Sequence, residues 1–217
     1  MRIYRNGLGL NLIDMIAIFL LTALIGFQVE SAYASEYDAP FGLVWGAKNK
    51  ELEKLGVTLK LDQRLSSVNI FNAETLPLTP SGTIYIKLSI DDKFGMQRVN
   101  WIGGKTENDI FGSEGKKKFS ELENIITEKY GNPLSDYKYV GKKLYREHDE
   151  FYQCLAYKGC GSWITFWRIN SGGSISLELS GLGRGSGVMK LIYEGPGWEA
   201  VVNSVKEERA KKSKKAF

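Results

Sequence analysis

The sequence is poorest in histidine and cysteine, and both shortages limit the chemistry that the chain can perform. His148 is the only histidine among 217 residues, and Cys154 and Cys160 are the only cysteines. A Ser-His or Cys-His catalytic pair would have to use His148, and a zinc site would have one imidazole at most. The segment 146–150 (REHDE) alternates in charge, which is typical of a solvent-exposed turn. We therefore expect no catalytic histidine and no metal site.

Glycine is common, at 24 residues, but the glycine-rich segment 181–187 completes no catalytic motif. A nucleophile elbow around Ser186 would need glycine at position 184, where the chain has Arg184. A phosphate-binding loop needs a helix to follow it, whereas the pattern of residues 188–193 indicates a strand. The segment is better interpreted as a flexible connection between strands, and we predict no cofactor.

Paired carboxylates keep one enzymatic alternative open. Asp91 and Asp92 are adjacent, and Glu147 lies close to Asp149 and Glu150. A glycoside hydrolase needs two such groups across a cleft, a placement that sequence alone does not define. Adjacent aspartates are also common in turns, because their side chains accept turn geometry and are well hydrated.

The N-terminus resembles an export signal. Arg2 and Arg5 precede an apolar run over residues 16–27, and small residues at the two recognition positions end at Ala34. We predict a signal peptide over residues 1–34 with cleavage between Ala34 and Ser35, which places the mature protein in the periplasm or outside the cell. A retained membrane anchor is the alternative, although the run is shorter than the roughly 20 residues that span a bilayer.

Export to an oxidising compartment favours a disulfide between Cys154 and Cys160. A redox-active pair is the alternative, but such pairs usually have two residues between the sulfurs and open a helix, whereas these flanks suggest a turn.

The formal net charge is +4, and the basic excess is concentrated at the C-terminus. In residues 206–217, six Lys and Arg residues face only Glu207 and Glu208. We interpret this basic tail as a solvated helix end and expect no nucleic-acid partner; contact with an anionic membrane, through this tail or an uncleaved N-terminal segment, is the alternative.

Strand patterns dominate the second half of the chain. The segments 163–169, 174–180 and 188–193 alternate at period two with glycine-rich turns between them, and 83–90 with 96–102 reads as a hairpin. From 57 to 80 the pattern is weak and predicts one short strand and a long loop.

Helical periodicity recurs before both groups of strands. It covers residues 50–56 and 114–130. In the second of these helices we expect Ser113 as the cap and a buried stripe that includes Ile125. A last helical pattern, over residues 198–205, follows the second group of strands. Together these patterns predict one α+β domain over residues 35–205, with helices mainly on one face of an antiparallel sheet and a possible tandem repeat of helix then strands.

Two short motifs resemble uncharacterised exported bacterial proteins. They are the opening Phe41-Gly-Leu-Val-Trp-Gly46 and the helix end Tyr130-Gly-Asn-Pro133. Some proteins of this kind resemble the helix-plus-sheet modules of outer-membrane assembly lipoproteins and of the secreted β-lactamase inhibitor protein. The resemblance implies a similar α+β architecture and no particular functional residue.

The best candidate site is a partner-binding face or edge of the sheet. Trp163 and Trp167 share one face of their strand, with Ile164 and Phe166 on the other, and Arg184 lies in the glycine-rich connection. Aromatic and arginine residues are enriched at interface centres. The same tryptophans would alternatively pack in the core. We expect a non-enzymatic module that binds a protein, as an envelope assembly factor or inhibitor would.

Overall fold

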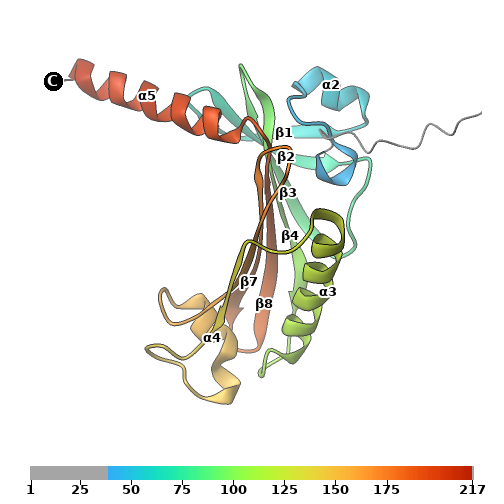
Figure 1. Cartoon of the computed structure of the whole chain (residues 1–217), viewed down its shortest axis with the longest axis vertical. Helices are drawn as coiled ribbons and strands as arrows, with labels where there is room; N and C mark the ends of the chain where they lie inside the picture. Colours follow the sequence, from blue (N-terminus) through green and yellow to red (C-terminus); the bar gives the residue numbers. More distant parts are fainter. Residues whose placement is uncertain (1–38, 217) are drawn as a thin grey trace, which may run out of the picture. The chain divides into compact units, whose positions relative to one another are not determined.

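Residues 39–216, which the computed structural model describes, build one antiparallel sheet of eight strands in the order β1-β2-β3-β4-β8-β7-β6-β5 (Figure 1). The strands are β1 Thr58–Leu65, β2 Val68–Thr75, β3 Thr83–Asp91, β4 Gly95–Thr106, β5 Ser135–Tyr139, β6 Ser162–Arg168, β7 Ser174–Gly183 and β8 Ser186–Glu194. The predicted signal peptide and its cleavage site at Ala34 and Ser35 lie outside the described residues.

The chain order divides the sheet into two similar halves. In each half a helix precedes four strands that pair in sequence order, and the last strands, β4 and β8, pair at the centre. The helices are α2 (Asn49–Lys54) and α3 (Ser113–Tyr130), and the second half also holds a 3-10 turn, η2 (His148–Glu150), with α4 (Phe151–Ala156) before β6. The predicted α+β class and the order of helix then strands in both halves are confirmed.

One face of the sheet carries the core. Leu88, Val99, Trp101, Leu177 and Leu191 point to this face, and each is at most 5% exposed. Helix α3 lies across them, and α2 lies on the same side (Figure 1). Burying so many large apolar side chains between one helix layer and one sheet face supplies the main driving force for folding.

The contact face of α3 explains which predicted core residues are buried. Gly115, Phe119 and Ile126 are buried at helical spacing, whereas Ile125 is 61% exposed, so its predicted place in the buried stripe is wrong. A stripe of 3.6-residue period that contains Ile126 leaves the preceding residue about 100° away from the sheet. The predicted cap is also wrong, because Ser113 lies in the first turn after Gly112 and makes no side-chain cap hydrogen bond.

The weakly patterned segment 57–80 forms two strands instead of the predicted single strand and long loop. Strands β1 and β2 pair through a turn at Ser66 and Ser67, with a register shift between Leu61 and Gln63. Strand β1 is the outer edge of the sheet and most of its side chains are exposed. An edge strand needs little apolar alternation and often carries charges and irregularities that discourage pairing with other chains.

The glycine-rich connection before β8 is shorter than predicted. Strand β7 continues to Gly183 and β8 begins at Ser186, so only Arg184 and Gly185 form the turn. Gly181 instead allows a close approach, because a Cβ atom there would lie 1.8 Å from the backbone oxygen of Tyr152. A glycine in a strand often marks such a contact.

Tyr152 links α4, the start of α3 and the end of β4. Its hydroxyl lies 2.8 Å from Asp109 Oδ2 and 2.8 Å from Thr106 Oγ1. The hydroxyl has one proton, which it donates to the carboxylate, so Thr106 donates to the tyrosine oxygen. Asp109 Oδ2 also accepts from the Gly115 amide at 2.9 Å, and this carboxylate therefore takes the capping role predicted for Ser113.

The same network predicts a pH dependence of stability. Burial raises the pKa of Asp109, but hydrogen bonds from the Gly115 amide, the Tyr152 hydroxyl and the Glu114 and Ser113 amides together lower it below its usual value. The ionised form is therefore favoured by folding, and its contribution is present above the unfolded pKa and lost as the pH falls through the folded pKa. The stability gap between wild type and Asp109→Asn should be full near pH 7 and should shrink below about pH 4.

Chemical denaturation of both proteins between pH 2.5 and pH 7 measures this gap. The difference between the two curves isolates Asp109, since the other carboxylates titrate in both proteins. A gap that stays constant over the whole range would show that the Asp109 charge does not contribute to folding.

The C-terminal helix α5 (Trp198–Ala216) lies against the opposite face of the sheet at its first turns only (Figure 1). Val201 is buried, and Arg98 of β4 lies over the Trp198 ring at 5.1 Å. The helix continues well beyond the predicted end at Val205, so most of the predicted basic tail is helical. Among residues 39–216, no helix combines the length and the apolar character that crossing a membrane requires.

Candidate functional site

The sheet face opposite α3 is largely uncovered and carries a row of apolar side chains. Strand register places six residues in one line across β3, β4, β8, β7, β6 and β5: Tyr85, Ile102, Lys190, Glu178, Ile164 and Tyr137. A second line runs beside it through Asn100, Ile192, Ser176, Phe166 and Ser135. We call these two lines the open face.

Several apolar members of the open face contact solvent. Tyr137 is 53% exposed and Tyr85 is 43% exposed, while Ile164, Phe166 and Ile192 are half-buried. Tyr137 and Phe166 pack edge to face with ring centroids 6.3 Å apart. Ile164, Phe166 and Tyr137 are neighbours on β6 and β5, and exposed apolar groups of this kind are typical of interaction surfaces.

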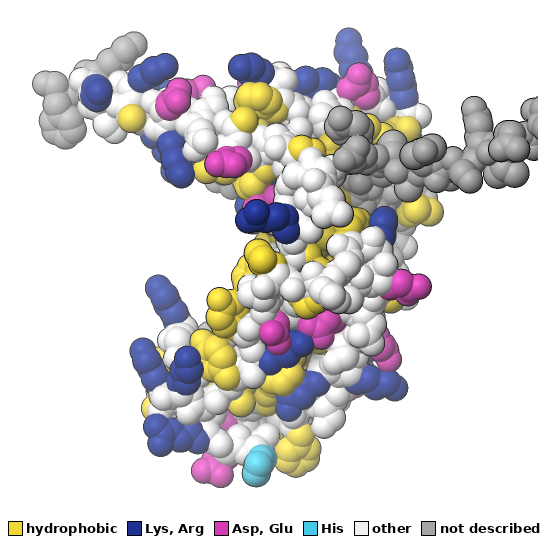
Figure 2. All heavy atoms as spheres, viewed as in Figure 1, with side chains coloured by type: hydrophobic (Ala, Val, Ile, Leu, Met, Phe, Trp, Pro, Cys, Tyr) yellow, Lys and Arg dark blue, Asp and Glu magenta, His cyan; other side chains and the backbone are white. Residues whose placement is uncertain are grey.

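The open face lies in a hollow. Figure 2 shows the molecule hollowed between α5 and the segment around α4, with hydrophobic side chains along the floor of the hollow. Two cavities lie where α5 meets the sheet, one of about 580 Å³ beside Arg168 and Glu194 and one of about 320 Å³ beside Arg98 and Asn100. The surface therefore fits a partner that protrudes into it better than a flat one.

Charged groups on the floor of the hollow are paired with each other. Lys190 lies 3.6 Å from Glu178 on the neighbouring strand, and Arg98 lies 3.6 Å from Glu194. Both pairs are partly exposed, so each contributes little to stability. Their positive and negative charges nevertheless cancel locally, and the floor has no strong charge of one sign.

The two sides of the hollow carry a basic excess. Figure 2 shows Lys and Arg side chains on α5 and on the segment around α4. On α5 these include Lys206, Arg209, Lys211 and Lys212, all exposed. On the other side the exposed cations Lys142, Lys143, Arg146 and Lys158 outnumber by one the acidic residues of the same segment, Glu147, Asp149 and Glu150. The electrostatic field of these groups favours an acidic partner.

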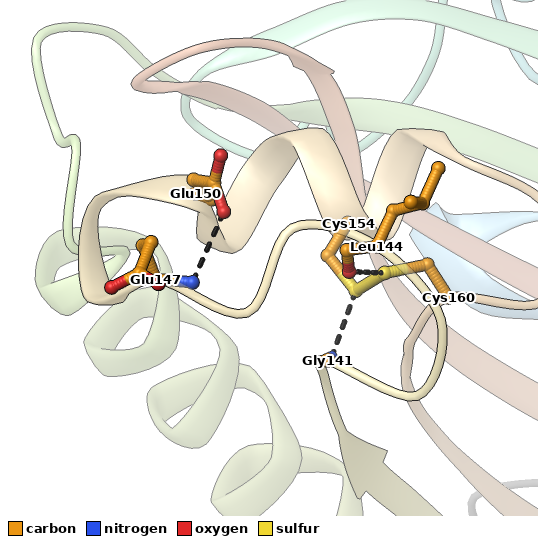
Figure 3. Close-up of a disulfide and its surroundings, with 6 residues drawn as sticks. All are labelled: Gly141, Leu144, Glu147, Glu150, Cys154 and Cys160. Carbon is orange, nitrogen blue, oxygen red and sulfur yellow. Dashed lines mark hydrogen bonds between the residues drawn. A yellow bond between two sulfur atoms is a disulfide. The ribbon is translucent and has the colours of Figure 1, made fainter.

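The predicted disulfide between Cys154 and Cys160 is confirmed, and it lies in the side of the hollow formed by the segment around α4 (Figure 3). It joins a helix to the start of a strand, because Cys154 belongs to α4 and Cys160 lies two residues before β6. Closing so short a loop stabilises the fold by about 2 kcal/mol in the chain-entropy model.

Backbone groups of residues 141–144 lie against the same disulfide. The Gly141 amide donates to Cys154 Sγ at 3.1 Å. The Leu144 carbonyl oxygen lies 2.7 Å from Cys160 Sγ, a close contact and not a hydrogen bond, because a disulfide sulfur carries no proton. The disulfide thereby positions the segment that carries Lys142 and Lys143.

The prediction that Trp163 and Trp167 contact a partner needs correction. Trp167 is 1% exposed, and its indole nitrogen donates to Thr127 of α3 at 3.3 Å. Trp163 is half-buried and packs against Phe151 with ring centroids 5.4 Å apart. Both tryptophans lie on the α3 face: Trp167 belongs to the core, and Trp163 packs against the core while staying partly exposed. The side chains of β6 that face the hollow are those of Ile164 and Phe166.

Arg184 is exposed, as a partner contact would require. It lies at the β7–β8 turn and forms an ion pair with Asp149 of the η2 turn. Its side chain is 64% exposed, so the ion pair leaves most of the guanidinium accessible. Arg184 is not a member of the open face, and its contact with a partner stays a prediction.

The candidate acidic residues serve local structure. Asp91 is 2% exposed and accepts hydrogen bonds from the Lys93 and Phe94 amides, at 2.8 and 2.9 Å. Glu150 accepts from the Glu147 amide at 3.0 Å at the start of the η2 turn (Figure 3). These contacts are turn and cap interactions, so the carboxylates of Asp91 and Glu150 have local structural roles.

The open face had a partial signal in the sequence. Ile164 and Phe166 alternate with the tryptophans, so their common face was predictable. The exposure of Tyr137 could not be predicted, because its short strand β5 has no clear alternation of apolar and polar residues and was itself not predicted. Which face of β6 stays open depends on where α3 crosses the sheet, which local patterns do not contain.

Comparisons with protein-family models, with curated proteins and with solved structures found no match. The candidate site is therefore defined by its own geometry and chemistry.

Proposed function

We propose that the chain is an exported binding module whose open face contacts an acidic protein. The observation that carries this proposal is a sheet face that is largely uncovered and carries apolar side chains, in a hollow between two sides with an excess of basic residues. A protein surface that projects an apolar segment surrounded by acidic residues would complement it in shape and charge. Export rests on the pattern of residues 1–34, and the disulfide is consistent with an oxidising compartment.

The size of the face supports a protein partner over a small molecule. It extends over six strands, and its apolar residues are separated by polar ones such as Lys190 and Ser176. Specific protein interfaces combine apolar contacts with a polar surround over about 800 Å² per partner. We propose no catalytic activity for this surface.

A planar anionic membrane is the alternative occupant of the basic groups. The exposed lysines and arginines of α5 after Lys206 favour it, since clustered cations bind anionic lipid surfaces. The membrane would contact α5 alone, because a flat bilayer does not enter a hollow. Loss of vesicle binding on deletion of residues 206–217, with the open face intact, would support this second function.

Photo-crosslinking tests the protein-binding function. A benzoylphenylalanine placed at position 166 in the full chain is expected to crosslink an envelope protein of the source cells, whereas the same group at position 125 on the outer side of α3 is not. The captured protein is then purified and its affinity measured at 50 and 500 mM salt.

Two results together would support the proposal: an adduct specific to position 166, and an affinity that falls with salt, as expected for exposed charges. Equal capture from both positions, or an affinity that does not change with salt, would contradict it.

A further inference from the structure

We propose that the cavity of about 320 Å³ between α5 and the sheet binds a single-chain anionic amphiphile, a carboxylate with an unbranched alkyl chain. The cavity has an apolar body, a polar end and a basic rim. Of the residues that define the open face only Asn100 lines it, and the cavity is complete without a partner on that face, so this inference does not depend on the proposed protein partner.

The body of the cavity is aliphatic, apart from the Trp198 ring that also lines it. It is lined by Leu65, Val68, Ile70, Val201, Val202 and Val205, from β1, β2 and α5. Its volume lies at the small end of the range for ligand pockets, which are mostly apolar with few polar groups. Aliphatic side chains on two opposite walls suit a flexible alkyl chain, whereas a peptide backbone would find few hydrogen-bond partners there.

The polar end holds two buried atoms that lack partners. Within residues 39–216, Arg98 Nε and Asn100 Oδ1 are buried and have no hydrogen-bond partner. Glu194 lies 3.6 Å from Arg98 Nε, too far for a hydrogen bond. The Asn100 amide can present its NH₂ group after a half-turn of the side chain, so both residues can donate to one carboxylate.

The charges around the cavity select an anion. Arg98, Lys206 and Arg209 line it, and Glu194 is the acidic side chain nearest to Arg98. None of the described residues that line the cavity is acidic. Glu208 of α5 contacts the hydroxyl of Ser66. The rim is therefore net positive and disfavours a cationic amphiphile.

The walls of the cavity are held in place by the corner between β8 and α5. Gln97 of β4 is 6% exposed, and its side-chain oxygen accepts from the Gly197 amide at 2.8 Å. Its backbone oxygen accepts from the Gly195 amide at 2.8 Å. These bonds fix the start of α5 over the sheet, so the cavity is formed before a ligand enters and little ordering is needed on binding.

Titration calorimetry with dodecanoate, kept below its micelle concentration, tests this site in the full chain. We expect one bound molecule, with affinity reduced at least about ten-fold in Val205→Trp, which fills the cavity, and at least about ten-fold in Arg98→Gln. Arg168→Gln, which removes a cation outside this cavity, should bind as the wild type does. Every variant keeps the apolar run of residues 16–27, so any binding of dodecanoate to that run is the same in all of them. Differences in affinity between variants therefore report on the cavity.

Dodecanol and anionic vesicles identify the chemistry that is recognised. Dodecanol should bind at least about ten-fold more weakly than dodecanoate, because it lacks the charge. If Val205→Trp fails to fold, the exposed pair Lys206→Gln/Arg209→Gln should still weaken dodecanoate several-fold. Equal affinity for dodecanol, an unaltered affinity in the folded variants, or binding to vesicles without binding to dodecanoate would overturn the proposal.

Discussion

Replacing Trp167 by alanine should lower the free energy of unfolding by about 3–5 kcal/mol, whereas the same change at Phe166 should lower it by about 1–2 kcal/mol. The two residues are neighbours on β6 with similar apolar content. Trp167 is 1% exposed under α3, and its removal leaves a cavity and an unpaired Thr127 hydroxyl. Phe166 is half-buried on the open face, so its removal leaves no enclosed cavity.

Urea denaturation followed by far-ultraviolet circular dichroism measures both values, with m-values checked for two-state unfolding. Thr165→Ala is a useful third variant, because this buried side chain donates to Glu123 of α3 at 2.6 Å and reports on the same face as Trp167. If Phe166→Ala proved as destabilising as Trp167→Ala, the open face would have to be covered in solution, and the assignment of faces would be wrong.

Replacing Phe166 by aspartate should weaken binding of the acidic partner at least about 30-fold, which corresponds to the roughly 2 kcal/mol that marks a central interface residue. The change removes an aromatic contact from the open face, on the strand next to the edge strand β5, and adds a negative charge opposite an acidic surface. The effect should lie mainly in the dissociation rate, since the basic sides that steer association are unchanged.

Ile125→Asp is the matched control for this variant. It also puts a charge in place of an exposed apolar residue, but on the outer side of α3, where the side chain is 61% exposed. Surface plasmon resonance with the purified partner should give near wild-type affinity for Ile125→Asp. Equal weakening by both variants would show that net charge, and not the open face, determines binding.

Much of the fold could be predicted because its strongest signals are local. Period-two alternation defined β6, β7 and β8, and helical spacing defined α3 and the start of α5. The pairing of β4 with β8 could not be predicted, because it joins residues about 90 positions apart that share no local pattern. Only one strand was predicted where β1 and β2 lie, because an edge strand such as β1, exposed on both sides, does not need alternating apolar residues.

The predicted tryptophans and the proposed open face lie on opposite faces of the same strand, β6. β6 is apolar on both sides, so its sequence cannot distinguish the face under α3 from the open one. The larger aromatics, Trp163 and Trp167, fill the space between sheet and helix, where large side chains bury the most area. Of the basic groups on the two sides of the hollow, only those at the C-terminus could be recognised from the sequence. Lys142 and Lys143 add to the positive charge beside the open face because the disulfide positions their segment there.

Hydroxyl-radical footprinting of the purified complex tests most directly whether the open face is the binding surface. Tyr85, Tyr137 and Phe166 should lose reactivity when the acidic partner binds, because their rings contact solvent in the free protein. Leu78 and Ile125, which are exposed elsewhere, should react equally in both states. Protection confined to α3 or the β1 edge, with Tyr137 and Phe166 as reactive as before, would contradict the proposed site.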